Sequence, residues 1–176
     1  MFVLKEKFFY LSKNNTTDEY LRIAVYATLL FLIPIFLGHQ LIVGVVVNAL
    51  LIMSALEHSI KKMAILCLLP SLAVVSTGFL FGTLTSFLLL MLPFIWISNF
   101  IIAFISKKLF ISKGKNYFLS ITFASIAKTI FLFVSVTILF VLGLVPLIFL
   151  TAFGILQLIT AESGAIIVGF LKLRKQ

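Results

Sequence analysis

Three long stretches without a charged side chain constrain this chain more than any other feature of its sequence. Residues 23–56 contain no Asp, Glu, Lys or Arg over 34 positions, and residues 63–106 contain none over 44. Residues 116–171 carry only Lys128 and Glu162. One transmembrane helix needs about 20 apolar residues, so each stretch is long enough for two helices.

The composition indicates that lipid, rather than water, covers most of the folded surface. Hydrophobic residues make up 62% of the 176, charged residues make up 11%, and the mean hydropathy is +1.28. A water-soluble domain needs more polar groups than this to cover its surface. The apolar runs are continuous and do not alternate as barrel strands do. Because backbone groups in a bilayer must be paired internally, we predict an all-α integral membrane bundle.

Proline, glycine and small polar residues divide each apolar stretch into two spans. The breaks are expected at residues 34–40, 76–86 and 143–146, where these residues end one helix and allow a turn. Kinks are expected at Pro70 and Pro93, which fall inside spans. The six predicted transmembrane helices cover residues 20–37, 40–57, 63–77, 84–106, 117–142 and 146–171.

The basic residues predict the orientation of these six helices. Thirteen of the fourteen lie on one side of the path: Lys5, Lys7, Lys13, Arg22, Lys61, Lys62, Lys107, Lys108, Lys113, Lys115, Lys172, Arg174 and Lys175. The positive-inside rule therefore places both termini in the cytoplasm, with the protein in the cell (plasma) membrane. A transmembrane domain over 20–172 is expected to follow a cytoplasmic or interfacial segment at 1–19 and to precede a tail at 173–176.

The charge distribution and the missing motifs exclude several classes of function. The net charge of +9 lies in short clusters between apolar runs, so we expect contact with membrane lipid and not with nucleic acid. There is no phosphate-binding loop, no His-Glu-x-x-His and no serine nucleophile elbow. Two histidines and one cysteine, far apart, make no metal site. We therefore expect a protein that is not an enzyme and that holds no metal or cofactor.

Two opposite charges are predicted to lie within the membrane on neighbouring helices. Lys128 is roughly 16 Å above the cytoplasmic end of the fifth span and Glu162 roughly 15 Å above that of the sixth, at 1.5 Å per residue. A very short turn joins these antiparallel spans, so the sequence predicts an ion pair between the two side chains. Intramembrane charges often mark functional sites. The pair either fixes the packing of the last hairpin or forms a charged layer that contacts a polar ligand.

Other polar side chains are expected near the middle of the membrane. Asn48 has Gly44 one turn away on the same face, which permits close helix approach. Asn99 has Trp96 on its face, so the two either cradle a flat ligand or simply make contacts between helices or with lipid. Gln157 lies about 140° around the sixth helix from Glu162, so at most one of them points at a central site.

The second span and the turn before it resemble the S components of energy-coupling-factor transporters. S components, the substrate-binding membrane subunits, often read Pro-Gln, apolar residues, Gly and then Val-Asn-Ala-Leu-Leu. From Gly38 this chain reads GHQLIVGVVVNALL, with His39 in place of the proline. The matching positions are Gln40, Gly44, Val47, Asn48, Ala49, Leu50 and Leu51. Further segments similar in position and character are a fourth span with Pro93 and Asn99, SIAKTIFLFV from Ser125, and LQLITAESGA from Leu156.

This resemblance covers residues 20–172 and implies a function in uptake. It implies that the protein binds a vitamin or similar micronutrient in the outer half of the membrane. Transport would then require a separate transmembrane coupling subunit and two ATPase subunits. The implied substrate-binding residues are Gln40, Trp96, Asn99, Lys128, Gln157 and Glu162. Small residues on the first helix, here Ala24, Ala27 and Thr28, would form the surface that docks onto the coupling subunit.

Two other classes of function fit the same composition. The alternative hypothesis is a non-catalytic membrane scaffold or assembly subunit, which would bind no small molecule. A self-sufficient channel or carrier is a third possibility, and it would transport without ATPases.

Overall fold

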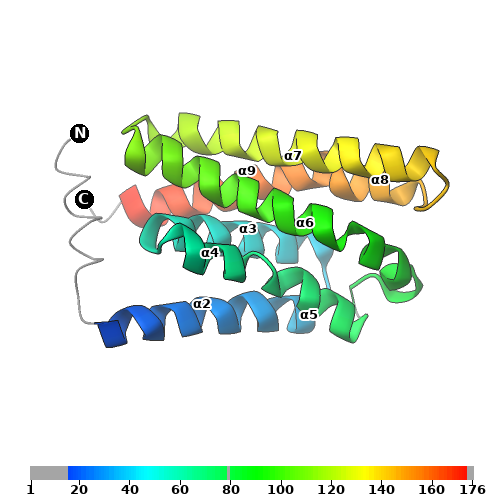
Figure 1. The fold of residues 1–176 in the computed structure, drawn as a ribbon, viewed down its shortest axis with the longest axis horizontal. Helices are drawn as coiled ribbons and strands as arrows, with labels where there is room; N and C mark the ends of the chain where they lie inside the picture. Colours follow the sequence, from blue (N-terminus) through cyan, green and yellow to red (C-terminus); the bar gives the residue numbers. More distant parts are fainter. Residues whose placement is uncertain (1–15, 79, 174–176) are drawn as a thin grey trace.

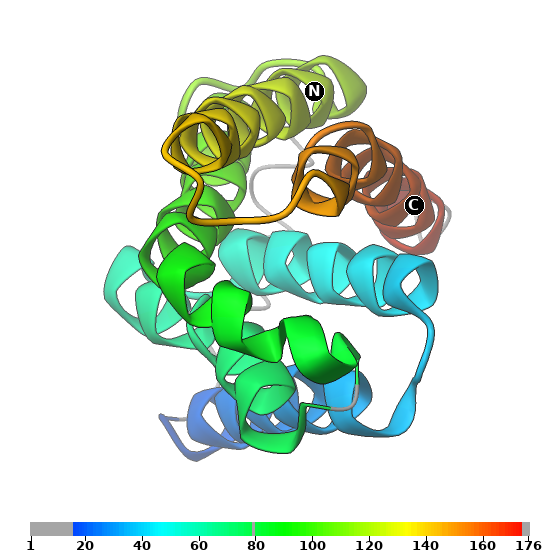
Figure 2. The ribbon, with the colours of Figure 1, turned by 90° about the vertical axis from the view of Figure 1, so that its right-hand side faces the viewer.

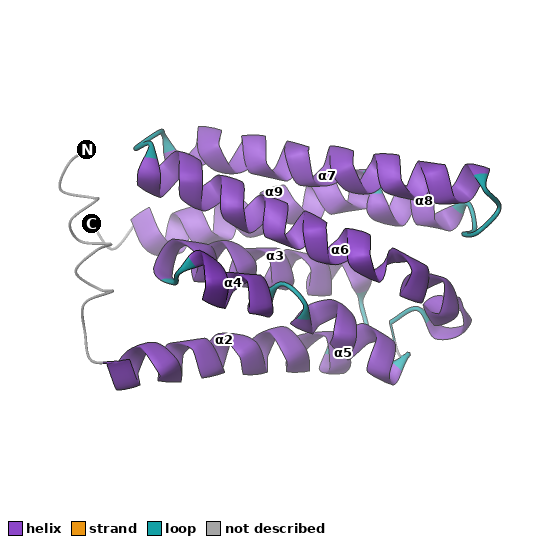
Figure 3. Ribbon diagram, viewed as in Figure 1, coloured by secondary structure: helices purple, strands orange, loops and turns teal. Residues whose placement is uncertain are grey.

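The computed structural model describes residues 16–78 and 80–173. Most of the N-terminal segment predicted at 1–19, and most of the tail predicted at 173–176, lie outside the described residues. Within those residues every regular element is a helix and there is no strand (Figure 3). The prediction of an all-α bundle is therefore confirmed for this part of the chain.

Within the described ranges, six helical segments are long and apolar enough to cross a membrane. They cover Thr17–Phe36, Gln40–Glu57, Ile60–Thr77, Gly82–Ser112, Tyr117–Val141 and Ile148–Leu171. The individual helices are α2 (Thr16–Phe36), α3 (Gln40–Glu57), α4 (Ile60–Leu66), α5 (Leu69–Thr77), α6 (Thr85–Ser106), α7 (Tyr117–Val141), α8 (Ile148–Phe153) and α9 (Ile155–Leu173). A 3₁₀ turn at Gly82–Leu84 leads into α6, and a π-helical turn at Lys107–Ser112 extends it.

The long helices run side by side along the longest axis of the molecule (Figure 1). Helix α3 lies in the middle of the bundle and packs against α2, α4, α6 and α9, as the end-on view shows (Figure 2). The start of α2 and the end of α9 lie at the same end, together with the turns at 58–59 and 113–116. We call this end, which carries Lys61, Lys62 and Lys113, the basic end. The opposite end has the turns at 37–39, 78–84 and 142–147, which carry no charged residue, and we call it the neutral end.

Large apolar side chains cover the outside of the bundle, as expected of a surface that faces lipid. Leu119, Val141 and Phe170 are each at least 67% exposed, and they lie on α7 and α9. Such a surface is not stable in water. The fold therefore supports a multi-pass membrane protein.

Two of the six spans are interrupted. The third divides at Cys67 and Leu68, just before Pro70 in the first turn of α5, so the predicted kink is a complete break between two helices. The sixth divides at Gly154, a break that was not predicted. A Cβ atom at Gly154 would lie 2.5 Å from the Leu150 carbonyl oxygen and 2.8 Å from the Phe133 ring. The predicted kink position Pro93, in contrast, lies within the continuous helix α6.

Helices α3 and α9 approach each other closely through glycine. A Cβ at Gly164 would lie 2.7 Å from the Val45 carbonyl oxygen and 2.8 Å from the Ala49 nitrogen, and both atoms belong to the α3 backbone. A Cβ at Gly44 would lie 2.9 Å from the Thr160 methyl group. Small residues at such positions let helix backbones pack tightly in a membrane. This contact fixes the height at which α9 meets α3, and with it the positions of Asn48 and Thr160.

Candidate functional site

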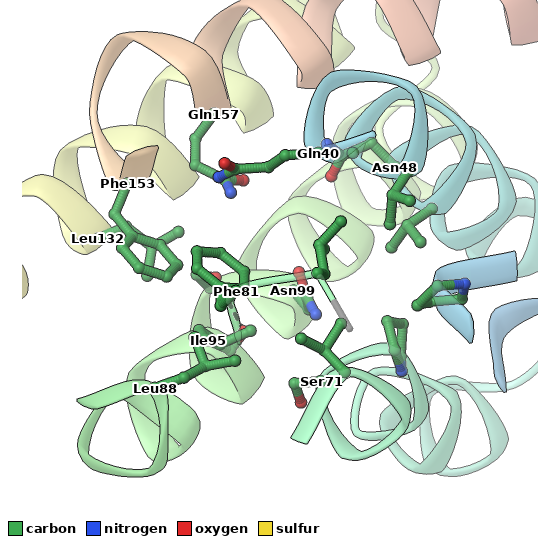
Figure 4. Close-up of a pocket in the computed structure, with 18 of the residues that line it drawn as sticks. Gln40, Asn48, Ser71, Phe81, Leu88, Ile95, Asn99, Leu132, Phe153 and Gln157 are labelled. Atoms are coloured by element: carbon green, nitrogen blue, oxygen red, sulfur yellow. Dashed lines mark hydrogen bonds between the residues drawn. The ribbon is translucent and has the colours of Figure 1, made fainter. Parts of the chain in front are cut away.

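A pocket opens between the helices in the half of the bundle nearer the neutral end. It contains about 630 Å³ of space free of protein atoms, including its open mouth. Its lining comes from α2, α3, α5, α6, α7, α8, α9 and the turn before α6 (Figure 4). The polar residues in this lining are Gln40, Asn48, Ser71, Ser98, Asn99, Lys128 and Gln157. A largely apolar pocket with a few converging polar groups is the usual form of a small-molecule site.

The ammonium group of Lys128 is the centre of the polar lining. Lys128 lies on α7 and is only 2% exposed, although it is in the membrane-spanning part of the bundle. Its Nζ donates hydrogen bonds to Asn48 Oδ1 at 2.6 Å and to Asn99 Oδ1 at 3.0 Å. Both acceptors are neutral amides. The cation is therefore solvated by protein dipoles but is not neutralised by a carboxylate.

The two asparagine amides are each held in place by a second hydrogen bond. Asn48 Nδ2 donates to Thr160 Oγ1 at 3.3 Å, which ties α3 to α9. Asn99 Nδ2 donates to the Cys67 carbonyl oxygen at 3.1 Å, at the break between α4 and α5. Because each NH₂ group has its own acceptor, each amide oxygen is turned toward Lys128. Together with the two bonds from Lys128, these bonds connect five of the six spans around one ammonium group.

The break in the third span supplies the acceptor for Asn99. Cys67 is the last residue before the chain leaves α4, so its carbonyl oxygen is not used by the next turn of that helix. A helix end in the membrane needs such partners from side chains, because no water reaches it. Asn99 therefore satisfies a backbone group and positions an acceptor for Lys128 at the same time.

The part of the pocket lining away from the asparagines is apolar and aromatic. The rings of Phe81 and Phe153 are parallel to within 2°, with centroids 6.4 Å apart. Leu88, Leu132 and Ile95 complete this wall beside them (Figure 4). Aromatic side chains offer large apolar surfaces against which a flat group can stack. The pocket is thus polar at Lys128 and apolar at the phenylalanines.

Gln40 and Gln157 lie across the pocket from Phe81 and point toward each other (Figure 4). Gln40 is the first residue of α3, at the neutral end, and Gln157 lies in the first turn of α9. Both side chains are half-buried. Their amides line the pocket, where they can donate to or accept from a polar group of a bound molecule.

The predicted ion pair between Lys128 and Glu162 is wrong. Glu162 Oε2 accepts a hydrogen bond from Thr122 Oγ1 at 3.3 Å, and Lys128 bonds to the two asparagines. Thr122 is six residues before Lys128, or about 9 Å along α7 at 1.5 Å per residue. The two charges therefore differ in depth, because the turn at 142–147 and the break at Gly154 set the height of α9.

The direction of Glu162 around α9 also excludes the pair. Thr160 faces Asn48 and the cluster around Lys128. Glu162 is two residues further on, a rotation of about 200° in an α-helix. It does not line the pocket, and its Oε1 is buried without a hydrogen-bond partner among the described residues. Gln157 does line the pocket, in agreement with the expectation that at most one of the two faces a central site.

Four of the six predicted substrate-binding residues lie in the pocket, namely Gln40, Asn99, Lys128 and Gln157. Trp96 lies outside the lining and donates through Nε1 to Ser71 Oγ at 2.8 Å. It thereby positions a residue of the pocket wall from behind. The sequence had placed Trp96 and Asn99 on one face of α6, and both do contact the third span.

Several residues of the pocket lining were not among the substrate-binding residues predicted from the sequence. Asn48 was identified as a polar residue near the middle of the membrane, but it was not assigned to ligand binding. The sequence did indicate a polar partner for Asn48, because burying an unpaired asparagine in an apolar span is energetically unfavourable. Phe81 and Phe153 gave no such signal among 20 phenylalanines.

The proposed docking residues on α2 point in two directions. Ala24 and Thr28 are exposed on the outside of the bundle, whereas Ala27 is half-buried and packs against the core cluster that contains Tyr26 and Leu30. A surface through Ala24 and Thr28 is accessible to another helix. Ala27 faces the wrong way to contribute to it.

The part of the chain that the structure describes contains no group of three metal-ligating side chains. Comparisons with protein-family models, curated proteins and solved structures found no match to this chain. The fold and the pocket define the protein only as far as this: a helical bundle with six segments able to span a membrane, and a largely apolar pocket that contains a buried lysine. The resemblance to S components stays a prediction.

Proposed function

We propose that this chain is the substrate-binding membrane subunit of an ATP-driven uptake transporter for a micronutrient of vitamin type. The ligand enters at the neutral end and binds in the pocket around Lys128. The basic end faces the cytoplasm, so the ligand is captured from outside the cell. A separate transmembrane coupling subunit and two ATPase subunits supply the energy.

The observation that carries this proposal is the buried, amide-held ammonium of Lys128 at the base of a pocket. A lysine whose only purpose is packing needs no adjoining cavity, whereas this one lines a space large enough for a small organic molecule. Buried charges inside membrane proteins mark ligand or ion sites because their burial is costly. A scaffold subunit has no use for such a group.

Partner subunits are part of the proposal because this sequence has no phosphate-binding loop with which to bind and hydrolyse ATP. The exposed small residues Ala24 and Thr28 on α2 leave a surface on which another membrane helix can pack closely.

Affinity purification of the tagged full-length chain from its native membranes tests this proposal. The expected result is co-purification of one further integral membrane protein and two proteins with phosphate-binding loops. Replacing both Ala24 and Thr28 by Leu is expected to remove all three without changing the melting temperature, since the positions are exposed. The same purification from Val25→Leu, an exposed neighbour on α2, should keep them. Recovery of wall or division proteins without any ATPase would contradict the proposal.

A further inference from the structure

We infer that the ligand is a singly charged carboxylate with an apolar or aromatic body and no amine. The inference rests on the proposed function and assigns the chemical class of the substrate to the same pocket. It goes beyond that function, which leaves the ligand's charge open.

The lining of the pocket carries one basic side chain and no acidic side chain. Lys128 is the one charged residue among the described residues that line it. Its acceptors, Asn48 and Asn99, are neutral, so the positive charge is uncompensated when the pocket is empty. A charge buried in a low-dielectric site is favourable only when it is paired and hydrogen-bonded. A ligand with one negative charge completes this pairing.

The hydrogen bonds of Lys128 leave one of its N–H donors for that charge. A lysine ammonium has three N–H donors, and two of them are used by the asparagines at 2.6 and 3.0 Å. The described residues provide no third acceptor, and Lys128 itself lines the pocket. A carboxylate oxygen of the ligand can take the third N–H while its body extends toward Phe81 and Phe153.

The same lining disfavours other classes of ligand. A zwitterionic amino acid or an amine needs a carboxylate partner, and Glu162, the intramembrane acid, faces α7 outside the pocket. A phosphate ester carries more than one negative charge and is commonly bound by arginine or by several cations, whereas this lining has a single lysine. An uncharged ligand leaves the ammonium unpaired.

Thermal unfolding of the purified full-length protein with a panel of small metabolites tests the inference. The panel contains five classes: monocarboxylates, their neutral amides, amino acids, amines and phosphate monoesters. We expect monocarboxylates to raise the melting temperature and their matched amides to leave it unchanged. Stabilisation by members of another class, but not by monocarboxylates, would overturn the inference and leave the proposed function standing. Stabilisation by no class at all would overturn both.

Two variants test the role of the ammonium group. Lys128→Met is expected to weaken binding of a stabilising monocarboxylate by about tenfold to hundredfold, the range for one hydrogen bond to a charged group. The control Glu162→Gln removes a carboxylate outside the pocket and should leave the affinity unchanged. Equal affinity of Lys128→Met and wild type would contradict the inference.

A third variant, Asn48→Asp, is expected to stabilise the protein when the pocket is empty. It places a carboxylate 2.6 Å from the ammonium, and the Thr160 hydroxyl can turn to donate to it. The empty variant is expected to melt at a higher temperature than wild type, because Lys128 is now paired. It is also expected to lose the affinity for monocarboxylates. A lower melting temperature together with unchanged affinity would show that the charge was already compensated.

Discussion

Asn99 lies between a broken helix and a buried cation, so its contribution to stability depends on Lys128. We expect Asn99→Leu to lower the free energy of unfolding by about 1.5–3 kcal/mol, because Lys128 loses a charged hydrogen bond. In a Lys128→Met background, Asn99→Leu should lower the free energy of unfolding distinctly less, since no ammonium group is left unpaired. A double-mutant cycle by denaturant unfolding in detergent measures this coupling. Equal costs in both backgrounds would mean that the two side chains act independently.

His58 is a second buried polar residue, at the basic end of the bundle just after α3. It is 2% exposed, and neither ring nitrogen has a hydrogen-bond partner among the described residues. Its ring meets that of Tyr26 edge to face, with centroids 5.5 Å apart. Burial lowers the pKa of His58 below its ordinary value of about 6.5. The charged residues that act on it are Glu57 and Glu19, which oppose this shift, and Lys62 and Arg22, which add to it.

This lowered pKa predicts a loss of stability in acid. As the pH falls through about 6.5, the unfolded chain binds a proton at His58 that the folded protein resists, so folding becomes less favourable. We expect the melting temperature to fall between pH 7.5 and 5, and His58→Phe to remove part of that fall. His39→Gln, at the exposed histidine, is the matched control and should leave the pH profile as it is. Identical profiles for wild type and His58→Phe would refute this expectation.

At the scale of helices, the contact between α3 and α9 has the least freedom to adjust. Gly164→Ala puts a methyl group within 2.8 Å of the α3 backbone, so the helices must separate. We expect the free energy of unfolding to fall by about 1–3 kcal/mol, the usual effect of overpacking a core. Ile166→Ala, at an exposed position on α9, is the control and should cost less. A Gly164→Ala protein that melts at the wild-type temperature would show that the contact is looser than described.

The helices themselves were largely predictable from sequence, whereas their rotations were not. Apolar length and the Pro and Gly residues at 34–40 and 143–146 predicted six spans because those signals are local. The break at Gly154 was missed because it depends on the Phe133 ring across the helix interface. Glu162 was placed opposite Lys128 by counting depth alone. Thr160 faces Asn48, and Glu162, two residues further along α9, therefore points away from Lys128. The sequence gives no direct measure of how α9 is rotated about its axis.

For the whole molecule, the placement of the basic residues predicts which end of the bundle lies in the cytoplasm. A cysteine at the exposed position 39, at the neutral end, should react with a membrane-impermeant maleimide in intact cells. A cysteine at the exposed position 113, at the basic end, should react only after the cells are permeabilised. The native Cys67 is buried and provides no background. The reverse pattern for His39→Cys and Lys113→Cys would invert the topology and place the pocket mouth in the cytoplasm.

Both the proposed function and the inferred ligand class require that the pocket around Lys128 holds a small molecule. Native mass spectrometry of the full-length protein, released from detergent, measures this most directly. We expect a wild-type population that is heavier than the bare chain by the mass of one small metabolite, and a Lys128→Met population at the mass of the chain alone. A wild-type protein that carries no added mass, even after incubation with extract of its own cells, would contradict the account.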